Sequence, residues 1–354
     1  MNPVGNGIVG CGPIAQAAHL PATVKAANAT LIAVCDRSER LRTAAQSMHG
    51  ASIAYADAAD LFADTRVEAV IIAVADPFHV PLAIAALHAG KHVLVEKPLS
   101  DTLASAHELA AVHAQTDRIL HIGNNKRYDM GIEYARDMAW GALGQRIAYR
   151  GWYCDSHLRY TATDNLQPSF VTADDTLRPV LDPKTDRRRY LLLTHGSHLV
   201  DTARYICGPI VRVQTQYRTV EGARCWYSAV TFADGTLGHL DLTVTIQGDH
   251  HEGFHLYSQH GSILAKTYLP WFFKSSDVEV FTSTDAQYHR PLGADGHSYR
   301  RQIEGFCAAI RGNQGVRAAT IDDGVAALAV LTAMTRSAEA NAAWVDVSTA
   351  AGLP

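Results

Sequence analysis

The sequence predicts an α/β protein with two different sheets. From residue 7 to residue 122, short apolar strands alternate with helices, a pattern typical of a doubly wound parallel sheet. After residue 210, strands follow one another with turns at residues 233–235 and at Gly261, which predicts a mainly antiparallel sheet. We therefore expect a nucleotide-binding-type domain over residues 1–124 and a second domain over residues 125–354, whose last helices can pack back on the first.

The composition is that of a folded protein. The chain has 354 residues, of which 47% are hydrophobic and 19% charged, enough for about two domains. A net charge of -4 gives no basic field for nucleic acid, and no apolar run is long enough to span a bilayer. The N-terminus lacks the pattern of a secretory signal. We therefore expect a cytoplasmic protein without a membrane or nucleic-acid partner.

The six cysteines are scattered along the chain, and no C-x-x-C motif is present. An even number permits disulfides, but in a chain of this size reduced intracellular thiols are the better interpretation.

A glycine-rich turn near the N-terminus predicts a dinucleotide site. The pattern G-x-G-x-x-A is formed by Gly10-Cys11-Gly12-Pro13-Ile14-Ala15, between a strand ending at Val9 and a helix expected over residues 13–27. Gly10 permits the tight turn, Gly12 lets the backbone approach a pyrophosphate, and Ala15 keeps the helix close to the sheet. The start of the helix adds free N–H groups and the positive end of the helix dipole.

Asp36 is the predicted ribose ligand. It ends a strand over residues 31–35, about 20 residues after the glycine pattern, where a carboxylate can bind both ribose hydroxyls. The same charge repels a 2′-phosphate, which favours NAD. Arg37 could instead bind that phosphate, so NADP stays open, or Arg37 is simply an exposed residue before a helix over residues 38–49.

Lys97 is a candidate for chemistry because of where it stands. Strands are expected over residues 67–74, 92–95 and 118–122, and helices over 79–89, 103–115 and, after the sheet, 131–140. Ligands bind outside the carboxyl ends of parallel strands, and Asp36, Val74–Asp76 and Glu96-Lys97 all follow such ends. A lysine at such an edge can act as an acid, a base or an electrostatic clamp. The alternative is a solvated lysine after a strand.

Three motifs together resemble one enzyme family. They are the G-x-G-x-x-A turn, the block A-G-K-H-V-L-V-E-K-P at residues 89–98, and G-N-N-K-R-Y at residues 123–128. The chain is similar here to the Gfo/Idh/MocA family, densely over its first third and sparsely over the rest. The resemblance implies a Rossmann domain followed by an α/β domain with an open, mainly antiparallel sheet. It also implies NAD(P)-dependent oxidation of a secondary alcohol of a sugar or cyclitol, in a homodimer or homotetramer formed through the second sheet.

The resemblance also assigns residues. It implies that Lys97 meets both substrate and nicotinamide, and that Arg127 and Tyr128 bind substrate; Asp155 is a further candidate only because it follows a strand over residues 147–155. Further cofactor contacts are implied for Val74, Ala75, His79, Glu96, Lys97 and Asn125. Val74 and Ala75 replace the Thr-Pro that is frequent in the family, so we expect a differently shaped loop under the nicotinamide.

The helix expected over residues 191–208 supplies the other catalytic candidates. Thr194, His198, Asp201 and Tyr205 share one helical face. The stretch resembles the family's D-x-G-x-H segment, with His198 in place but Thr194 at the aspartate position. A threonine can hydrogen-bond a hydroxyl but carries no charge to tune a histidine. His198 is the expected base, against the alternative of a core histidine, and His195 is a second candidate.

Two other features have competing interpretations. The polar segment 156–190, with arginines at 187–189, could cover the substrate and bind an acidic or phosphorylated sugar, or it is a solvated surface or a subunit contact. The motif H-E-x-x-H at residues 251–255 resembles a zinc site, but a glycine interrupts it and strand-forming residues flank it. We expect a strand and no metal there.

These residues are compatible with three functions. The first is a dehydrogenase in which Lys97 stabilises the alkoxide and His198 takes the hydroxyl proton. The second, suggested by Thr194, is a glycoside hydrolase or lyase that oxidises its sugar transiently, eliminates a group and reduces the product. The third is a sensor that binds dinucleotide and sugar without turnover.

Overall fold

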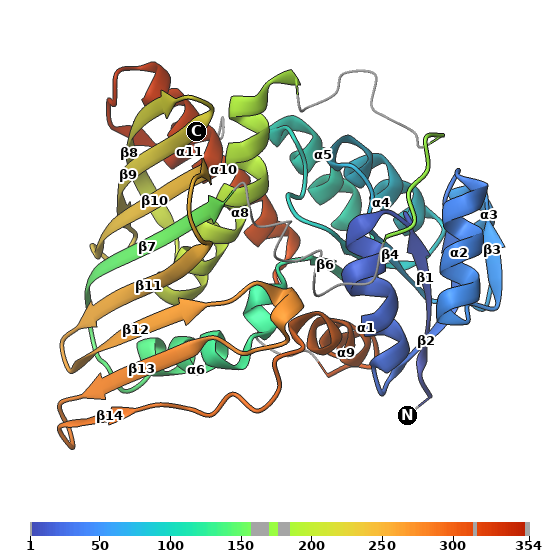
Figure 1. The fold of residues 1–354 in the computed structure, drawn as a ribbon, viewed down its shortest axis with the longest axis horizontal. Helices are drawn as coiled ribbons and strands as arrows, with labels where there is room; N and C mark the ends of the chain where they lie inside the picture. The colour runs from blue at the N-terminus through green and yellow to red at the C-terminus, as the bar shows by residue number, and fades with distance from the viewer. Residues whose placement is uncertain (1, 157–169, 176–184, 314–316, 351–354) are drawn as a thin grey trace. The chain divides into compact units, whose positions relative to one another are not determined.

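The computed structural model describes residues 2–156, 170–175, 185–313 and 317–350, and the chain divides into two compact units (Figure 1). Unit 1 consists of Met1–Asn125, Gln167–Thr185 and Tyr299–Val325. Unit 2 consists of Lys126–Leu166, Asp186–Ser298 and Ala326–Pro354. Each unit has its own sheet and its own core, so each is described by itself.

Unit 1 contains the predicted parallel sheet. Its six strands have the order β3-β2-β1-β4-β5-β6, and every pairing is parallel. The order reverses at β1, which is the topological switch of a doubly wound sheet. The strands are β1 Val4–Val9, β2 Ala29–Cys35, β3 Ile53–Tyr55, β4 Ala69–Ile72, β5 His92–Val95 and β6 Leu120–Ile122. The sequence did not predict β3, whose run of three half-buried residues is too short to show a strand pattern.

The helices of unit 1 begin and end at recognisable residues. The Ser38 side chain caps α2, and a glycine with positive φ, Gly50, ends it. The predicted helix over residues 13–27 has a π-helical turn, η1, in its middle. The helices are η1 Ala15–His19, α1 Leu20–Lys25, α2 Glu39–His49, α3 Ala58–Ala63, η2 Asp76–Phe78, α4 His79–His88, α5 Leu103–His113 and α9 Ser298–Ile310. The short helix η3, Asn125–Tyr128, begins at Asn125 of unit 1, and its other three residues belong to unit 2.

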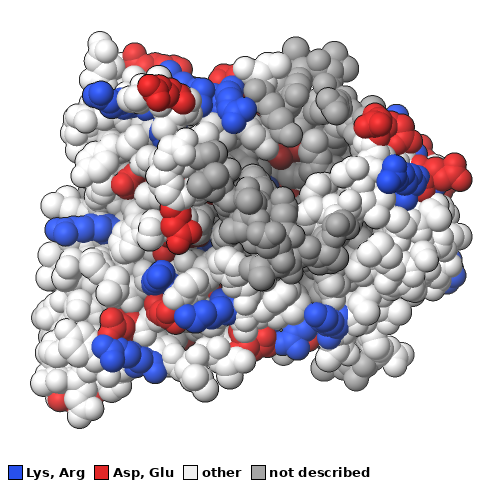
Figure 2. Space-filling model, in the orientation of Figure 1, with Lys and Arg blue, Asp and Glu red and all other residues white. Residues whose placement is uncertain are grey.

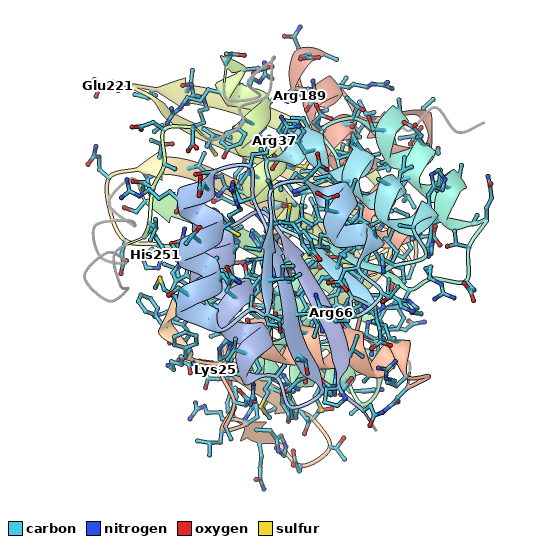
Figure 3. All side chains as sticks on the ribbon, turned by 90° about the vertical axis from the view of Figure 1, so that its right-hand side faces the viewer. Lys25, Arg37, Arg66, Arg189, Glu221 and His251 are labelled. Carbon is cyan, nitrogen blue, oxygen red and sulfur yellow. The ribbon has the colours of Figure 1, made fainter. Side chains whose placement is uncertain are left out.

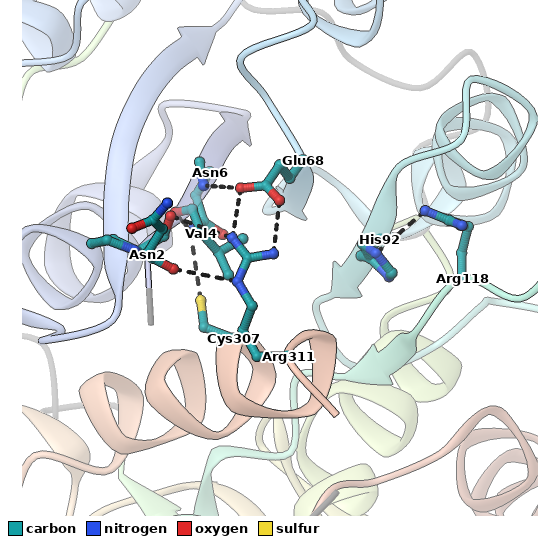
Figure 4. Close-up of polar contacts among 10 residues, drawn as sticks. Asn2, Val4, Asn6, Glu68, His92, Arg118, Cys307 and Arg311 are labelled. Carbon is teal, nitrogen blue, oxygen red and sulfur yellow. Dashed lines mark hydrogen bonds and ion pairs between the residues drawn. The ribbon is translucent and has the colours of Figure 1, made fainter. Parts of the chain in front are cut away.

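Helix α9 is fastened to the amino-terminal edge of the unit 1 sheet (Figure 4). The Arg311 guanidinium donates to both carboxylate oxygens of Glu68, at 2.8 and 2.9 Å. Glu68 also accepts from the Gly5 N–H at 3.1 Å. The buried Asn6 amide donates to the Cys307 sulfur at 3.6 Å. A helix from the end of the chain therefore belongs to the core of the first sheet.

Unit 2 contains a nine-stranded, mostly antiparallel sheet, as predicted. The order is β14-β13-β12-β11-β7-β10-β9-β8-β15, and the only parallel pair among these described strands is β7 with β10. The strands are β7 Arg146–Ser156, β8 Ile210–Val220, β9 Ala223–Phe232, β10 Leu237–Ile246, β11 His251–Ser258, β12 Gly261–Thr267, β13 Asp277–Thr282, β14 Gln287–His289 and β15 Val345–Asp346. The sequence did not predict β12, β13 or β14.

Helices cover one face of this sheet. Helix α8, Arg187–Cys207, packs on β7 and β10, and α6, Met130–Trp140, packs on β12 and β13. At Gly196 in α8, an added Cβ would lie 2.7 Å from Leu331 in α10, Ile321–Glu339, so the two helices approach closely. The short α11, Val347–Ala350, contacts β8.

The other face of the unit 2 sheet, which we call the open face, carries apolar side chains. Tyr227 on β9 is 53% exposed, Leu237 on β10 is 65% exposed and Tyr257 on β11 is 42% exposed. Their strand neighbours at alternate positions, such as Trp226 and Leu240, are fully buried under the helices. Alternation along each strand therefore gives the sheet two faces of different environment.

The surface shows no separation of charge on the side drawn in Figure 2, where acidic and basic side chains are interspersed. No helix in the described part of the chain combines the length and the apolar character that crossing a bilayer requires. All six cysteines lie in the described ranges, and each is a free thiol.

Candidate active site

The glycine turn of unit 1 has the geometry of a phosphate cradle. Gly10 has φ +95°, and an added Cβ would lie 2.4 Å from the carbonyl oxygen of Ala73, so only glycine fits there. An added Cβ at Gly12 would meet nothing within 4 Å, which leaves the space beside this backbone open for a ligand. The residues present therefore fit the pyrophosphate of a dinucleotide.

Asp36 is held beside this turn. Its Oδ2 accepts from the Cys11 N–H at 2.8 Å, and its Oδ1 accepts from the Ser38 N–H at 2.9 Å. These two backbone donors fix the carboxylate at the carboxyl end of β2, where a ribose would lie. The exposed Arg37 lies at the same end of the strands, and Arg66 lies at the opposite end (Figure 3).

Two buried thiols, those of Cys11 and Cys35, lie next to this turn. The Cys11 and Cys35 side chains are buried on either side of the turn, and burial is the main cause that raises the pKa of the Cys35 thiol to about 12. Burial also raises the pKa of Cys11 well above its usual range. Both side chains are therefore neutral thiols, and Cys11 contributes its backbone to the cradle.

Lys97 follows β5, and its main chain is fixed by a buried carboxylate. The Oε2 of Glu96 accepts from the Lys97 N–H at 3.0 Å, and its Oε1 lies 2.7 Å from Nε2 of the fully buried His19. Burial acts to raise the pKa of Glu96, but the His19 hydrogen bond and the charges of His19, Lys97 and His79 outweigh it, so that pKa lies below its usual value. Glu96 is therefore an ionised group directly beneath the Lys97 backbone.

A second histidine, His79, contacts the backbone of Pro98, the residue after Lys97. The Nδ1 of His79 lies 2.8 Å from the carbonyl oxygen of Pro98, and its Nε2 lies 3.1 Å from that of Val74. His79 thereby ties the loop after β4, which includes Val74 and Ala75, to the residue after Lys97. Asn125, also implied as a cofactor contact, is buried at the start of η3.

Sequence reasoning missed His19. The only signal is its position: it lies four residues after Ala15, on the same helical side that faces the sheet. Nothing in the sequence indicates that its partner is Glu96, 77 residues away.

In unit 2, a group of titratable side chains lies around the ring of Tyr153. We call this group the Tyr153 cluster: Tyr153 with Lys126, Asp155, His195, His198, His250 and Glu252. From α8, the His198 ring lies parallel to Tyr153 at 5.9 Å, and the His195 ring lies at 5.5 Å. The His250 ring meets Tyr153 edge-on at 5.4 Å, and Lys126 Nζ lies 5.0 Å from the ring centre.

The cluster contains two carboxylates. Asp155 Oδ2 on β7 lies 3.5 Å from Nδ1 of His195, within ion-pair distance. Glu252 on β11 bonds Lys126 and lies 4.0 Å from Nε2 of His250. Thr194 is half-buried, and its carbonyl oxygen accepts from the Ser197 hydroxyl. The carboxylate beside an α8 histidine therefore comes from a neighbouring strand and not from position 194.

Arg127, which the resemblance implies as a substrate-binding residue, forms a buried ion pair in unit 2. Its Nε and a terminal nitrogen bond the Asp201 carboxylate at 2.6 to 3.1 Å, and its guanidinium lies 5.0 Å from the Tyr205 ring. Both partners of the ion pair are buried, and so is Tyr128. The geometry shows Arg127 attaching η3 to α8.

The structure bears on the polar segment 156–190 and on the H-E-x-x-H motif at residues 251–255. The segment expected to be polar and irregular up to residue 190 ends earlier, because residues 187–189 form the first turn of α8, capped by Asp186. Residues 157–169 and 176–184 of that segment lie outside the described residues. The H-E-x-x-H motif lies on strand β11, as expected. Within the described ranges, no three His, Cys, Asp or Glu side chains are grouped so that they could hold a metal ion.

Comparison with known proteins adds to this geometry. Residues 4–124 match the family model "Oxidoreductase family, NAD-binding Rossmann fold", and residues 168–264 match the model "GFO/IDH/MocA C-terminal domain". An inositol 2-dehydrogenase from Rubrobacter xylanophilus is 26% identical over 266 residues, 73% of this chain and 70% of that protein.

Two further similarities, one in sequence and one in fold, extend over nearly the whole chain. A 1,5-anhydro-D-fructose reductase from Ensifer adhaerens is 24% identical over 348 residues, 94% of this chain and 95% of its own. The structure of a levoglucosan dehydrogenase in complex with NADH and L-sorbose superposes with a TM-score of 0.78 at 20% identity, covering 98% of this chain and 99% of that one.

Proposed function

We propose that this chain, which belongs to the Gfo/Idh/MocA family of NAD-binding oxidoreductases, acts on a secondary alcohol of a sugar, a sugar derivative or a cyclitol. The observation that carries the proposal is the placement of Lys97. It stands at the strand edge that also holds the glycine turn and Asp36, with its main chain fixed by Glu96 and its neighbour Pro98 held by His79. The names of the relatives support the alcohol class.

The cofactor residues follow from unit 1. The open space at Gly12 would take the pyrophosphate, Asp36 would bind the ribose hydroxyls, and the loop at Val74 and Ala75 would lie under the nicotinamide. NAD, when bound, supplies the acceptor for a hydride. We propose NAD as the natural cofactor because the fixed Asp36 carboxylate repels a 2′-phosphate; Arg37, which is exposed, is the residue through which NADP would bind.

The proposed chemistry assigns two roles. Lys97 stabilises the negative charge that develops on the substrate oxygen, and His198 accepts the hydroxyl proton. Beside these two residues, Asp155 provides a carboxylate to His195, the other α8 histidine against Tyr153, whereas position 194 carries no charge. Oxidation and reduction use the same residues in opposite directions.

A screen of sugars and cyclitols against NAD and NADP, read by the absorbance of the reduced cofactor, tests the reaction. With a substrate in hand, Lys97→Ala and His198→Ala should each lower kcat by about 10² to 10⁴, while NAD affinity is kept. Asp155→Asn should lower kcat less and shift the pH dependence of kcat. The matched control is His255→Ala on β11, outside the Tyr153 cluster. Near-normal turnover in Lys97→Ala or His198→Ala would remove that residue from the mechanism.

A second candidate function is a hydrolase or lyase that oxidises its substrate transiently. Thr194 at the aspartate position is the observation that favours it. Glycosidic cleavage without net formation of NADH would support this candidate, whereas net NADH with a free sugar would argue against it. The third candidate, a sensor without turnover, is excluded by any turnover that depends on Lys97.

We also propose that the chain forms a homodimer or homotetramer through the open face of the unit 2 sheet. Exposed apolar side chains on neighbouring strands, Tyr227, Leu237 and Tyr257 among them, are the support. A second copy of the same sheet offers a matching surface, and symmetric pairing is the commonest form of assembly.

A further inference from the structure

Gln16 makes three hydrogen bonds that no part of the proposed chemistry uses. Its Nε2 donates to the carbonyl oxygen of Cys11 at 2.8 Å and to that of Val171 at 3.0 Å. Its Oε1 accepts from the Val171 N–H at 2.9 Å. A glutamine amide has two N–H donors and one carbonyl acceptor, so the side chain engages all three of its groups at once.

These bonds join two distant parts of unit 1. Cys11 belongs to the glycine turn, and Val171 belongs to residues 170–175, which we call the strap and which lie 155 positions further along the chain. Both bonds to Val171 use its backbone, so this attachment of the strap does not depend on the Val171 side chain. Phe170, Val171 and Ala173 are half-buried, whereas Thr172, Asp174 and Asp175 are exposed.

The bonds of Gln16 lie beside the residues expected to bind the cofactor. The Cys11 N–H bonds Asp36, and its carbonyl oxygen accepts from Gln16, so one residue of the turn connects the ribose carboxylate to the strap. Gly12, which has open space beside its backbone, directly follows Cys11 in the chain. A dinucleotide with its pyrophosphate in that space would lie beside the strap.

We propose that Gln16 is a positioning residue that fastens the strap beside the glycine turn and so slows the release of bound dinucleotide. Breaking the Gln16–Val171 pair of bonds frees the strap, while the turn, Asp36 and the helix remain to bind the cofactor. The effect should therefore fall on the dissociation rate more than on the association rate. The inference rests on NAD binding alone and not on the substrate class.

The test measures NADH release by stopped flow, using displacement by excess NAD and the fluorescence of NADH. Gln16→Met keeps the length of the side chain and removes all three hydrogen bonds, and we expect the dissociation rate to rise about tenfold. Val171→Ala is the matched control: it changes the side chain but keeps both backbone bonds, so release should match the wild type. An unchanged rate in Gln16→Met overturns the proposal.

A second variant separates the strap from a direct contact between Gln16 and the cofactor. Val171→Pro removes the N–H that donates to Gln16 and should raise the release rate in the same direction. If the strap transmits the effect, the double variant releases NADH about as fast as the faster single variant. If the two effects multiply, Gln16 acts on the cofactor by itself and the proposal is wrong. Thermal unfolding without NADH checks that each variant is folded.

Discussion

At the scale of single residues, Glu96 explains how a lysine at a strand end is held in place. A charged carboxylate inside a protein is costly unless other groups compensate it. Here His19, the Lys97 N–H and nearby positive charges compensate Glu96. Gly123 makes room for it, because an added Cβ there would lie 3.0 Å from the Glu96 Cα. The unfavourable free energy of burying the Glu96 charge is thus offset by partners that include the backbone of Lys97.

This environment predicts a pH-dependent effect of Glu96→Gln. The pKa of Glu96 is lowered from 4.5 in the folded state, so its stabilisation is complete above that value and is lost as the pH falls through the folded pKa. We expect the variant to be about 2 kcal/mol less stable at neutral pH. The difference should shrink below about pH 4.5, because protonation then removes the same charge from the wild type. Urea unfolding at several pH values measures it.

The control for this change is Glu39→Gln in α2, whose side chain is 83% exposed and whose ion pair with Arg42 is long at 3.9 Å. It should alter the free energy of unfolding by less than about 0.5 kcal/mol. A stability difference for Glu96→Gln that does not vary with pH would show that Glu96 is not ionised in the folded protein.

At the scale of elements, α8 combines chemistry and anchoring. Its 21 residues present His195 and His198 to Tyr153, and one turn later Asp201 bonds Arg127. The same helix therefore holds the proposed base and the ion pair that fixes its own orientation. Residues spaced by three and four positions share a helical face, which is why the sequence predicted that His198 and Asp201 lie on one side of this helix.

Breaking the buried pair should loosen α8. Arg127→Met leaves the Asp201 carboxylate, 3% exposed, without its guanidinium, and we expect a loss of about 3 to 5 kcal/mol in the free energy of unfolding. The double variant Arg127→Met/Asp201→Leu should recover most of this loss, because no unpaired charge stays buried.

Urea unfolding of both variants measures this effect, with Arg212→Met in β8 as the control. The side chains of Arg212 and its partner Asp346 are 51% and 59% exposed, and loss of such a surface ion pair costs little. If the double variant is as unstable as Arg127→Met, the buried charge is not the cause of the loss.

At the scale of the whole molecule, each unit has its own sheet, and the two sheets use their faces differently. The central parallel strands of unit 1, β1 and β4, are buried at every residue. The sheet of unit 2 has one face under α6 and α8 and an open face with apolar side chains. An apolar face of this kind is a candidate interface between copies of the chain.

Charges introduced on the open face should therefore lower the mass of the assembly. We expect Tyr227→Asp/Leu237→Asp to shift the chain toward the monomer in light scattering after size exclusion, because burying two carboxylates in an apolar contact is unfavourable. Met48→Asp, on the 61% exposed Met48 of α2, is the control and should leave the mass unchanged. An unaltered mass in the double variant would place the interface elsewhere or show that the chain is a monomer.

The sequence alone predicted the parts of this protein that depend on local pattern. The parallel sheet follows from strand and helix periodicity, and so do the positions of Asp36 and Lys97 after the ends of β2 and β5. The glycine turn follows from Gly10, whose positive φ favours glycine. The strands β3 and β14 were missed because segments of three residues carry little periodicity. The strands β12 and β13 are longer and alternate in burial, so that signal was present in the sequence and was overlooked. The first turn of α8 was missed because three arginines resemble a solvated loop.

Only the tertiary structure decided which distant residues meet. It brought His19 to Glu96, Asp155 to His195, Arg127 to Asp201 and Gln16 to Val171. None of these pairs has a spacing that a helix or a strand imposes, because each joins segments that the packing of the core brings together. The local sequence shows which residue types stand at a site. The fold determines which partners set the charge and the position of those residues.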